Sequence, residues 1–281
     1  MKNFFIIARS LEAPYDEYVE RVTTYLCKKG ASVTVCDGQA AYATINDGKS
    51  LQIPKGCECV LTVGGDGIVV RAAALTACVD IPLCGINYGH LGYLCEITPE
   101  GLEVGLDKLL ADDYSLERRM MLSGYENGEP YADALNDVVI TSAERGLSVI
   151  NLEVSVNGSY LYRYDCDGLL FATPTGSTAY NLSLGGPIVA PDAKCIVMTP
   201  IGPHTLNSRP IVLGPNDEVT VTLKSRNLLG DEQVVVCFDG EEKKTLSVGG
   251  KITISASPNT TSMVRLEDSS FLERLRVRMA E

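Results

Sequence analysis

The first 113 residues alternate between short apolar runs and amphipathic segments, and this alternation constrains the fold more than any other feature. Four segments are apolar or β-branched and have the length of a strand: residues 4–8, 32–36, 59–63 and 82–86. Three segments between or after them have helical spacing: residues 15–29, 68–78 and 99–111. Alternating strands and helices predict a mainly parallel sheet with helices on both faces.

The pattern changes near residue 114, and strand signals dominate from there to about residue 257. Residues 150–156 alternate between apolar and polar, and Asn157-Gly158 is a strong hairpin turn signal. Further strands are expected at residues 137–141, 218–223, 233–238 and 251–255. We therefore expect an α/β domain over residues 1–113 and a β-rich domain over residues 114–260. The amphipathic tail, residues 270–281, is expected to be a helix or a strand.

Composition limits the kinds of partner. The 281 residues carry a formal net charge of −12, which argues against a nucleic-acid or anionic-membrane binder. A small anionic ligand remains compatible, because a pocket rich in backbone N–H groups can be locally positive. The apolar run after the N-terminal Met-Lys-Asn is too short for a signal-peptide core, and no stretch has the roughly 20 apolar residues of a membrane span.

Ten cysteines raise the question of disulfides or zinc. Several of them lie in apolar, strand-like runs, where a free thiol behaves as a small buried hydrophobe. The sequence has no Cys-x-x-Cys pair and two histidines, so a zinc site is not indicated. We therefore expect no bound metal of the protein's own and a reducing, cytoplasmic location.

The first glycine-rich segment, Gly64-Gly65-Asp66-Gly67, follows a predicted strand and precedes a predicted helix. Glycines allow a ligand to approach the backbone, and a helix N-terminus offers N–H groups to phosphate. A carboxylate repels phosphate, so Asp66 is better suited to accept a proton from a hydroxyl group. The alternative is a tight turn in which Asp66 only caps the helix. The spacing is neither a Walker P-loop nor a Gly-x-Gly-x-x-Gly fingerprint.

Two further segments are rich in glycine. Residues 87–94 contain two glycines and two tyrosines, which suits a loop that lays a ring against a flat ligand. The alternative is that Leu91 and Tyr93 fill the core. Residues 167–180, continuing to Pro187, contain the run Thr-Pro-Thr-Gly-Ser-Thr. Its hydroxyl groups could bind phosphate and ribose oxygens, although a β-turn rich in Ser and Thr is the alternative.

Two features are weaker. Asn136-Asp137 opens an apolar strand, and is either a solvated strand end or a sugar-binding pair. Residues 199–210 form a Pro-rich loop in which His204 is as compatible with a structural hydrogen bond as with a ligand contact. With two histidines and no evident partner for either, a Ser-His-Asp triad is not indicated.

Taken together and in this order, these segments resemble the NAD kinase family over about residues 60–240. The family's Gly-Gly-Asp-Gly motif matches residues 64–67, and Arg71-Ala72-Ala73 continues it. Its Asn-x-Gly-x-Leu-Gly-Phe-Leu loop matches residues 87–94, with Tyr93 in place of Phe. Its most specific signature, Asp-Gly followed by Thr-Pro-Thr-Gly-Ser-Thr-Ala-Tyr, matches residues 167–180. The Pro-rich loop through Arg209-Pro210 and the late Asp239-Gly240 also match.

The resemblance implies a Rossmann-like α/β domain, a β-sandwich domain, and a tail (residues 261–281) that packs back on the first. It implies transfer of the γ-phosphoryl group of ATP, with Mg²⁺ or another divalent cation, to the 2′-hydroxyl of the adenosine ribose of NAD. It also implies a homodimer or homotetramer. Asp66 would be the catalytic base, and Gly64, Gly65 and Gly67 would bind phosphate. The implied NAD-binding residues are Asp66, Gly67, Tyr93, Asn136, Asp137, Asp167, Thr178, Ala179, Tyr180 and Ser183.

Three positions depart from the family pattern. Ile68 stands where Thr is usual, Asp137 where Glu is usual, and Glu241 where many members have Gln. The first removes a hydroxyl near the phosphates, the second shortens the reach to the sugar, and the third adds a carboxylate. Two alternative functions remain. One is a non-catalytic dinucleotide sensor, in which Ile68 and Glu241 reflect lost donor binding. The other is a Gly-Gly-Asp-Gly kinase for a lipid or a sugar phosphate, because that motif alone is not specific.

Overall fold

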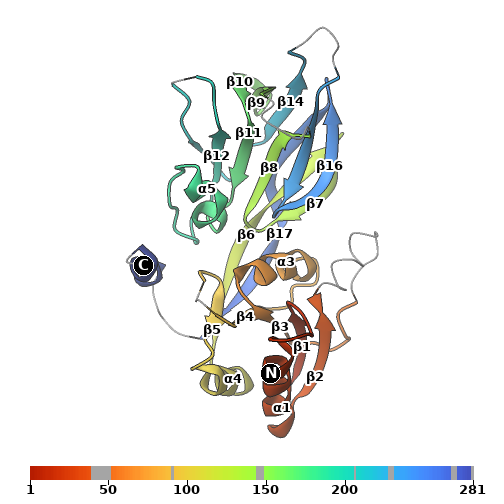
Figure 1. The fold of residues 1–281 in the computed structure, drawn as a ribbon, viewed down its shortest axis with the longest axis vertical. Coiled ribbons are helices and arrows are strands. Elements are labelled where there is room, and N and C mark those ends of the chain that lie inside the picture. The colour runs from red at the N-terminus through yellow and green to blue at the C-terminus, as the bar shows by residue number, and fades with distance from the viewer. Residues whose placement is uncertain are drawn as a thin grey trace. The chain divides into compact units, whose positions relative to one another are not determined.

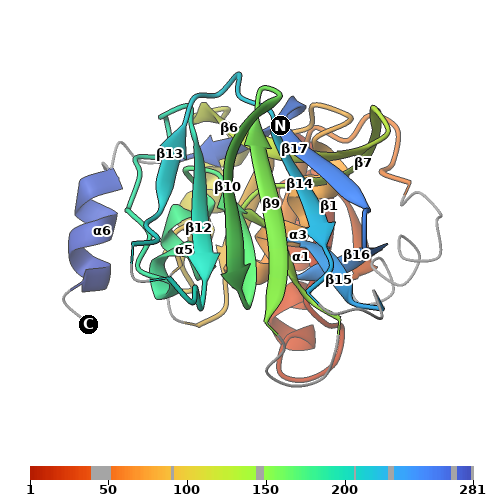
Figure 2. The same cartoon turned by 90° about the horizontal axis from the view of Figure 1, so that it is seen from above.

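The structure, a computed structural model, describes residues 1–38, 52–89, 92–143, 149–205, 207–226, 231–266 and 271–279. The chain divides into two compact units (Figures 1 and 2). Unit 1 comprises Met1–Arg118 and Thr261–Glu281, and unit 2 comprises Arg119–Thr260. Both boundaries fall within strands, so the chain contributes two separate segments to unit 1.

Unit 1 is built on a parallel sheet whose strands have the order β17-β4-β3-β1-β2, with β5 also paired to β4. The pairings of β1 with β2 and β3, and of β4 with β3, β5 and β17, are all parallel. The strands are β1 (Asn3–Ala8), β2 (Ser32–Asp37), β3 (Cys59–Gly64), β4 (Leu83–Asn87), β5 (Cys95–Ile97) and the end of β17 (Lys251–Arg265). The parallel sheet expected from the alternating pattern is confirmed.

Helices cover both faces of this sheet (Figure 1). The helices α1 (Asp16–Lys28) and α4 (Leu102–Leu110) share one apolar core with β1, β3 and β4. The helix α3 (Asp66–Thr76) packs on the opposite face, where a Cβ at Gly85 would lie 2.8 Å from Val69 Cγ2. Only glycine allows this close approach of helix and strand. The tail forms a helix, α6 (Phe271–Met279).

Unit 2 is a β-sandwich. One layer is an antiparallel sheet with the order β13-β12-β11-β8-β15-β16, and the other contains β10-β9-β14-β17 together with β6 and β7 (Figure 2). Apolar side chains of both layers form one core. The strands not yet given are β6 (Ser115–Glu126), β7 (Glu129–Ala134), β8 (Asp137–Ser142), β9 (Ile150–Val156), β10 (Ser159–Cys166), β11 (Gly168–Ala172), β12 (Ile196–Ile201), β13 (Ile211–Leu213), β14 (Val219–Lys224), β15 (Gln233–Phe238) and β16 (Glu241–Ser247).

The hairpin turn signal between β9 and β10 is confirmed. Asn157 and Gly158 have φ values of 51° and 78°, the two positive values that a type I′ turn requires. Several expected boundaries were wrong. The helix α3 begins at Asp66 rather than residue 68, because Gly65 already serves as its N-cap. The helix α4 begins at Leu102 rather than residue 99, and β17 continues to Arg265 rather than ending at residue 255.

Candidate active site

The first two glycine-rich segments of the sequence lie side by side in unit 1. They follow β3 and β4, which are neighbouring parallel strands with Gly64 opposite Asn87. Tyr88 N–H donates to the Gly64 carbonyl at 3.1 Å. Because the carboxyl ends of parallel strands meet at one edge of a sheet, this edge is where ligands of such folds bind.

The turn from β3 into α3 depends on its glycines. Gly64 has φ 153°, and a Cβ there would lie 2.9 Å from Ile68 Cγ2. Gly65 is the N-cap residue of α3 and Gly67 is exposed, with no atom within 4 Å of the position of a Cβ. This helix N-terminus therefore has room for a ligand, and its first N–H groups lack helical partners.

The Asp66 carboxylate is held by the second glycine-rich segment. Backbone N–H groups of Tyr93, Leu94 and Cys95 donate to it at 2.6, 3.2 and 3.3 Å. A Cβ at Gly92 would lie 1.9 Å from Asp66 Oδ1, so this segment can wrap the carboxylate only with glycine there. Oδ1 accepts two of these bonds and Oδ2 accepts one. The Cys95 thiol also lies against this carboxylate. Of the two oxygens, Oδ2 has fewer N–H partners within the described residues.

The sequence left open whether residues 87–94 contact a ligand or fill the core. In the described part Leu94 is buried, whereas Tyr93 and Gly92 are half-buried and so are not core residues. Asn87 is buried and donates to the Gly89 carbonyl at 2.6 Å, which closes the start of the loop. The predicted loop residues His90 and Leu91 lie outside the described residues.

One cation at the carboxyl ends of these parallel strands was not predicted from the sequence. Arg9 follows β1 directly, is exposed, and donates its backbone N–H to the Val63 carbonyl at 2.9 Å. Its guanidinium lies 5.7 Å from the centre of the Tyr15 ring, which in turn lies 4.8 Å from the Tyr88 ring. A charged residue directly after a buried apolar strand is the signal that could have identified it.

In unit 2 the structure brings Asn136-Asp137 and the hydroxyl-rich turn together. Thr173 N–H donates to the Asn136 carbonyl at 2.9 Å, and Thr173 Oγ1 donates to the Leu135 carbonyl at 2.6 Å. A Cβ at Gly176 would lie 2.0 Å from the Asn136 carbonyl oxygen. The turn is therefore packed against the backbone at the start of β8.

Part of this hydroxyl-rich segment is structural. Ser177 is buried and donates to the Pro174 carbonyl at 2.7 Å, and its oxygen accepts the Val189 N–H. Asn181 is buried and bridges Ser177, Pro187 and Thr199. These residues shape the loop. Accessible side chains in this segment include the half-buried Thr178 and Ala179 and the exposed Tyr180, Leu182 and Ser183.

A second residue that sequence analysis left without a role organises this region. The Asp239 carboxylate accepts the backbone N–H groups of Leu135, Asn136 and Asp137 at 2.7, 2.7 and 3.1 Å. Burial raises the pKa of Asp239 to about 6, although these three bonds oppose the increase. Burial, together with the charge of Asp239, raises the pKa of Asp137 to about 7. A carboxyl group with such a pKa at a candidate site is a functional signal.

The predicted contact Asp167 lies at another place in unit 2. It is half-buried at the start of β11, and a Cβ at Gly202 would lie 2.2 Å from its Oδ2. Gly202 belongs to the Pro-rich loop, and His204 N–H donates to the Asp165 carbonyl at 2.9 Å. The structure therefore brings Asp167 next to the Pro-rich loop, of which Leu206 lies outside the described residues.

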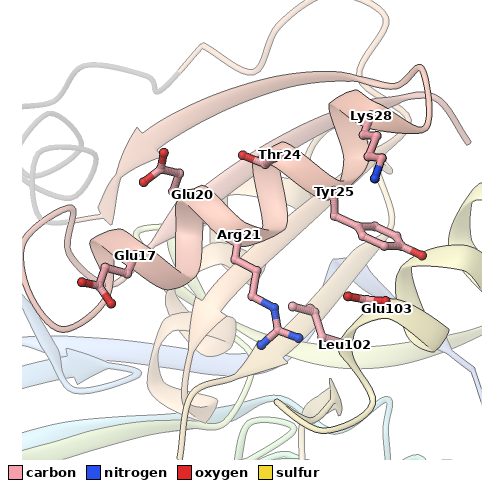
Figure 3. Close-up of a pocket in the computed structure, with 8 residues that line it drawn as sticks. All are labelled: Glu17, Glu20, Arg21, Thr24, Tyr25, Lys28, Leu102 and Glu103. Carbon is pink, nitrogen blue, oxygen red and sulfur yellow. The ribbon is translucent and has the colours of Figure 1, made fainter.

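A cavity of about 420 Å³ in unit 1 has a different lining. Figure 3 shows Arg21 and Tyr25 extending from α1 toward Leu102 and Glu103 at the start of α4. Acidic and basic side chains alternate around it, and no residue of the predicted site lines it. It does not take part in the candidate site.

Among the described residues, no group of three or more His, Cys, Asp or Glu side chains could hold a metal ion. Within the same residues, we find no helix with the length and apolarity needed to cross a membrane. All ten cysteines are free thiols, and Cys59, Cys84, Cys95 and Cys166 are buried as small apolar side chains.

One unit is an α/β unit with a Gly-Gly-Asp-Gly turn, and the other is a β-sandwich with a hydroxyl-rich turn. Together they define the class of two-domain Gly-Gly-Asp-Gly kinases. The family descriptions "ATP-NAD kinase N-terminal domain" and "ATP-NAD kinase C-terminal domain" match residues 4–114 and 135–266. The chain therefore belongs to the NAD kinase family and is an enzyme that phosphorylates NAD.

Relatives match over the whole chain. The NAD kinase of Agathobacter rectalis is 39% identical over 280 residues, covering 99% of each chain. The NAD kinase of Lachnospira eligens is 38% identical over 295 residues, covering 99% of this chain and 100% of its own. The resemblance inferred from the sequence motifs is confirmed.

Solved structures share the fold. Yeast NADH kinase, crystallised with NADH, has a TM-score of 0.85 at 21% identity and covers 100% of this chain and 88% of its own. An NAD kinase from Archaeoglobus fulgidus, crystallised with ATP, has a TM-score of 0.76 at 24% identity and covers 99% of this chain and 98% of its own. The expected α/β domain and β-sandwich domain are confirmed.

Proposed function

We propose that this enzyme transfers the γ-phosphoryl group of ATP to the 2′-hydroxyl of the adenosine ribose of NAD, which yields NADP. One observation carries the proposal: Asp66 stands at the β3–α3 turn with its carboxylate oriented by three backbone N–H groups. NADH and ATP, named as the bound molecules of the two similar structures, are the matching ligand classes.

In this proposal Asp66 is the catalytic base. Its Oδ2 accepts the proton of the 2′-hydroxyl while the hydroxyl oxygen attacks the γ-phosphorus and the bond from the γ-phosphorus to the β-phosphate oxygen breaks. Such a base accelerates the reaction by roughly 10²–10⁴-fold. The larger share comes from placing the two substrates in line and from neutralising phosphate charge.

The backbone at Gly64, Gly65 and Gly67 binds phosphate, because the first turn of α3 presents N–H groups and the positive end of the helix dipole there. The exposed guanidinium of Arg9 lies at the same edge and adds positive charge. With Ile68 in the place of a hydroxyl residue, donor binding relies on these backbone groups and on cations.

The dinucleotide contacts fall in two groups. Asn136 and Asp137 bind ribose hydroxyls with an amide and a carboxyl group. The accessible side chains of the hydroxyl-rich turn bind the adenine and its ribose, and Asp167 contacts the other end of the dinucleotide. Tyr93 is a further contact of the adenosine part. The proposed NAD-binding residues are Asp66, Gly67, Tyr93, Asn136, Asp137, Asp167, Thr178, Ala179, Tyr180 and Ser183.

A divalent cation, Mg²⁺ or another, enters with ATP as part of the substrate. Mg²⁺ prefers one or two carboxylates together with substrate phosphates over a cage made of protein alone. When bound, the cation neutralises charge on the phosphates, and Asp66 is the carboxylate beside them.

We also expect a homodimer or homotetramer in a reducing, cytoplasmic compartment. The ten free thiols support the reducing compartment, since an oxidising one would favour disulfides. Size-exclusion chromatography with light scattering measures the number of subunits directly.

The test is NADP formation from NAD, ATP and Mg²⁺, detected with an NADP-specific dehydrogenase. We expect the parent protein to produce NADP, and Asp66→Asn to lose about 10²–10⁴-fold in turnover while it still binds NAD. Asp16→Asn is the matched control, because Asp16 is likewise the first residue of a helix in unit 1 and is exposed. The control is expected to keep full turnover.

The other outcomes are equally informative. Retained turnover in Asp66→Asn would remove Asp66 from the role of base. Loss of NAD binding together with turnover would make Asp66 a residue that positions the loop of Tyr93. Absence of NADP with ATP, other nucleotides and polyphosphate would leave a dinucleotide sensor or a kinase for another acceptor.

A further inference from the structure

Asp239 occupies a turn that directs its side chain back to the start of β8. It follows β15 with φ 50° and precedes Gly240 with φ 80°, the two positive values of a tight hairpin turn into β16. β15 pairs antiparallel with β8, with Phe238 opposite Val138. Asp239 therefore lies beside Asp137, whose carbonyl accepts its N–H at 3.0 Å.

The Asp239 carboxylate provides acceptors that this segment needs. Three consecutive N–H groups, those of Leu135, Asn136 and Asp137, point to its two oxygens at 2.7, 2.7 and 3.1 Å. Two of these residues precede β8, so the strand ladder does not supply their acceptors. An amide offers one acceptor oxygen and two N–H donors, and cannot replace the carboxylate here.

The same segment is held from its other side. Thr173 bonds to the carbonyls of Leu135 and Asn136, and Gly176 packs against the Asn136 carbonyl. N–H groups and carbonyl groups of this segment are therefore both occupied. The backbone that carries the side chains of Asn136 and Asp137 has little freedom left.

Within the described residues, neither the Asn136 amide nor the Asp137 carboxyl group makes a hydrogen bond or an ion pair. Asp137 is only 7% exposed. Its carboxyl oxygens nevertheless keep some contact with solvent, since neither is a fully buried atom without a partner. A ligand can therefore reach them, and a hydrogen bond from it would compensate the burial of this carboxyl group.

We propose that Asp239 is a positioning residue that orients Asn136 and Asp137 toward the ribose hydroxyls of NAD, and that its charge sets the protonation of Asp137. This inference rests on the proposed function, in which this pair binds the ribose. Asp239 itself does not contact the substrate.

The effect of the Asp239 charge on the protonation of Asp137 has a measurable consequence. Burial raises the pKa of Asp137 first, and the charge of Asp239 raises it further, to about 7. Asp239, on the β15–β16 turn, is the charged group that acts on Asp137 within the described structure. Removing the charge of Asp239 therefore lowers the pKa of Asp137. The pH midpoint at which NAD binding changes shifts downward with it.

The experiment uses the full chain and four variants. Asp239→Asn tests the positioning role, and Asn136→Ala and Asp137→Ala test the ribose contacts. Asp217→Asn is the matched control: Asp217 also accepts a backbone N–H in unit 2, that of Gly214 at 2.7 Å, on an exposed turn outside the proposed site. KM for NAD, KM for ATP, kcat and Tm are measured from about pH 5.5 to 8.5.

We expect Asp239→Asn to raise KM for NAD about tenfold, as the loss of one hydrogen bond does. KM for ATP is expected to stay within about twofold, and the pH midpoint of KM for NAD to move downward. A merely structural defect would reduce the amount of active protein and lower kcat without either change. Asp217→Asn is expected to match the parent protein in KM for both substrates.

A folded Asp239→Asn with an unchanged KM for NAD and an unchanged pH midpoint overturns the proposal. If that variant does not fold, Asp239→Glu takes its place, since it keeps both oxygens and moves them by one methylene. A raised KM for NAD with an unchanged KM for ATP then supports the role, and an unchanged KM for NAD overturns it.

The variants test the ribose site and the role of Asp239 separately. If Asn136→Ala and Asp137→Ala leave KM for NAD unchanged, the ribose site is elsewhere and that part of the proposed function is wrong. If both raise KM for NAD and Asp239→Asn does not, the ribose site stands and only the role of Asp239 is wrong.

Discussion

At the scale of single residues, Asp137 carries a carboxyl group in conditions that disfavour its charge. It is 7% exposed and lies beside the second carboxyl group of Asp239. The native state therefore keeps its proton up to a pH of about 7, whereas the unfolded chain releases it near pH 4. Between these pH values Asp137 loses its proton in the unfolded chain but not in the native state, which stabilises the unfolded state. The free energy of unfolding therefore falls as the pH rises, and it levels off above pH 7.

Asp137→Asn is expected to remove this loss of stability. At pH 8 the free energy of unfolding should rise by on the order of 2–4 kcal/mol, and its decline between about pH 4 and 7 should weaken. Activity should fall at the same time, because the proposed ribose contact is changed. Urea unfolding at pH 5 and pH 8 measures the effect, with the exposed Asp16→Asn as control. Equal stability of the parent protein at both values would refute the prediction.

At the scale of elements, the turn after β11 packs tightly against the start of β8. Gly176 lies so close to the Asn136 carbonyl that a Cβ there would be 2.0 Å from its oxygen. Nothing in the conformation of Gly176 itself requires glycine, since its φ is not positive. The requirement comes from the neighbouring strand.

Gly176→Ala is therefore expected to push the turn away from β8. Backbone displacement of this kind costs about 1–3 kcal/mol, and KM for NAD should rise because Asn136 moves. Gly101→Ala is the control, since a Cβ at Gly101 meets only Thr98 Oγ1, at an ordinary 3.4 Å. Tm and KM for NAD of both variants decide the question: a Gly176→Ala protein indistinguishable from Gly101→Ala would contradict the packing argument.

At the scale of the whole molecule, segments from opposite ends of the chain complete unit 1. Glu96 on β5 binds Arg265 of β17 at 2.7 Å and Arg274 of α6 at 2.8 Å. Arg265 also binds Glu117 of β6 at 2.6 Å. The Glu96 side chain is 2% exposed, so its buried charge is compensated by these two guanidinium groups.

Glu96→Gln should therefore lower the free energy of unfolding by about 3–5 kcal/mol and loosen α6. Calorimetry measures the first effect, and the rate of tryptic cleavage within α6 measures the second. The control is Asp107→Asn, which breaks the exposed pair with Lys29 and is expected to leave Tm unchanged. A Glu96→Gln protein with the Tm and cleavage rate of the parent would refute the anchoring role.

Sequence patterns predicted the parallel sheet, its helices, the Asn157-Gly158 turn and the family. These features are local, because the burial of a residue follows from the period of its own strand or helix. Other strands escaped prediction. β10, for example, is exposed along most of its length and lacks the alternation that marks a half-buried strand.

The contacts that organise the candidate site were decided by the tertiary structure alone. The Asp66 carboxylate is held by N–H groups near residue 94, and Asp239 reaches N–H groups near residue 136. Ser177 and Asn181, which sequence analysis placed in a ligand-binding run, are structural. Such pairs depend on which strands become neighbours and in which register. No local period encodes that information, because a one-residue change of register would alter every partner.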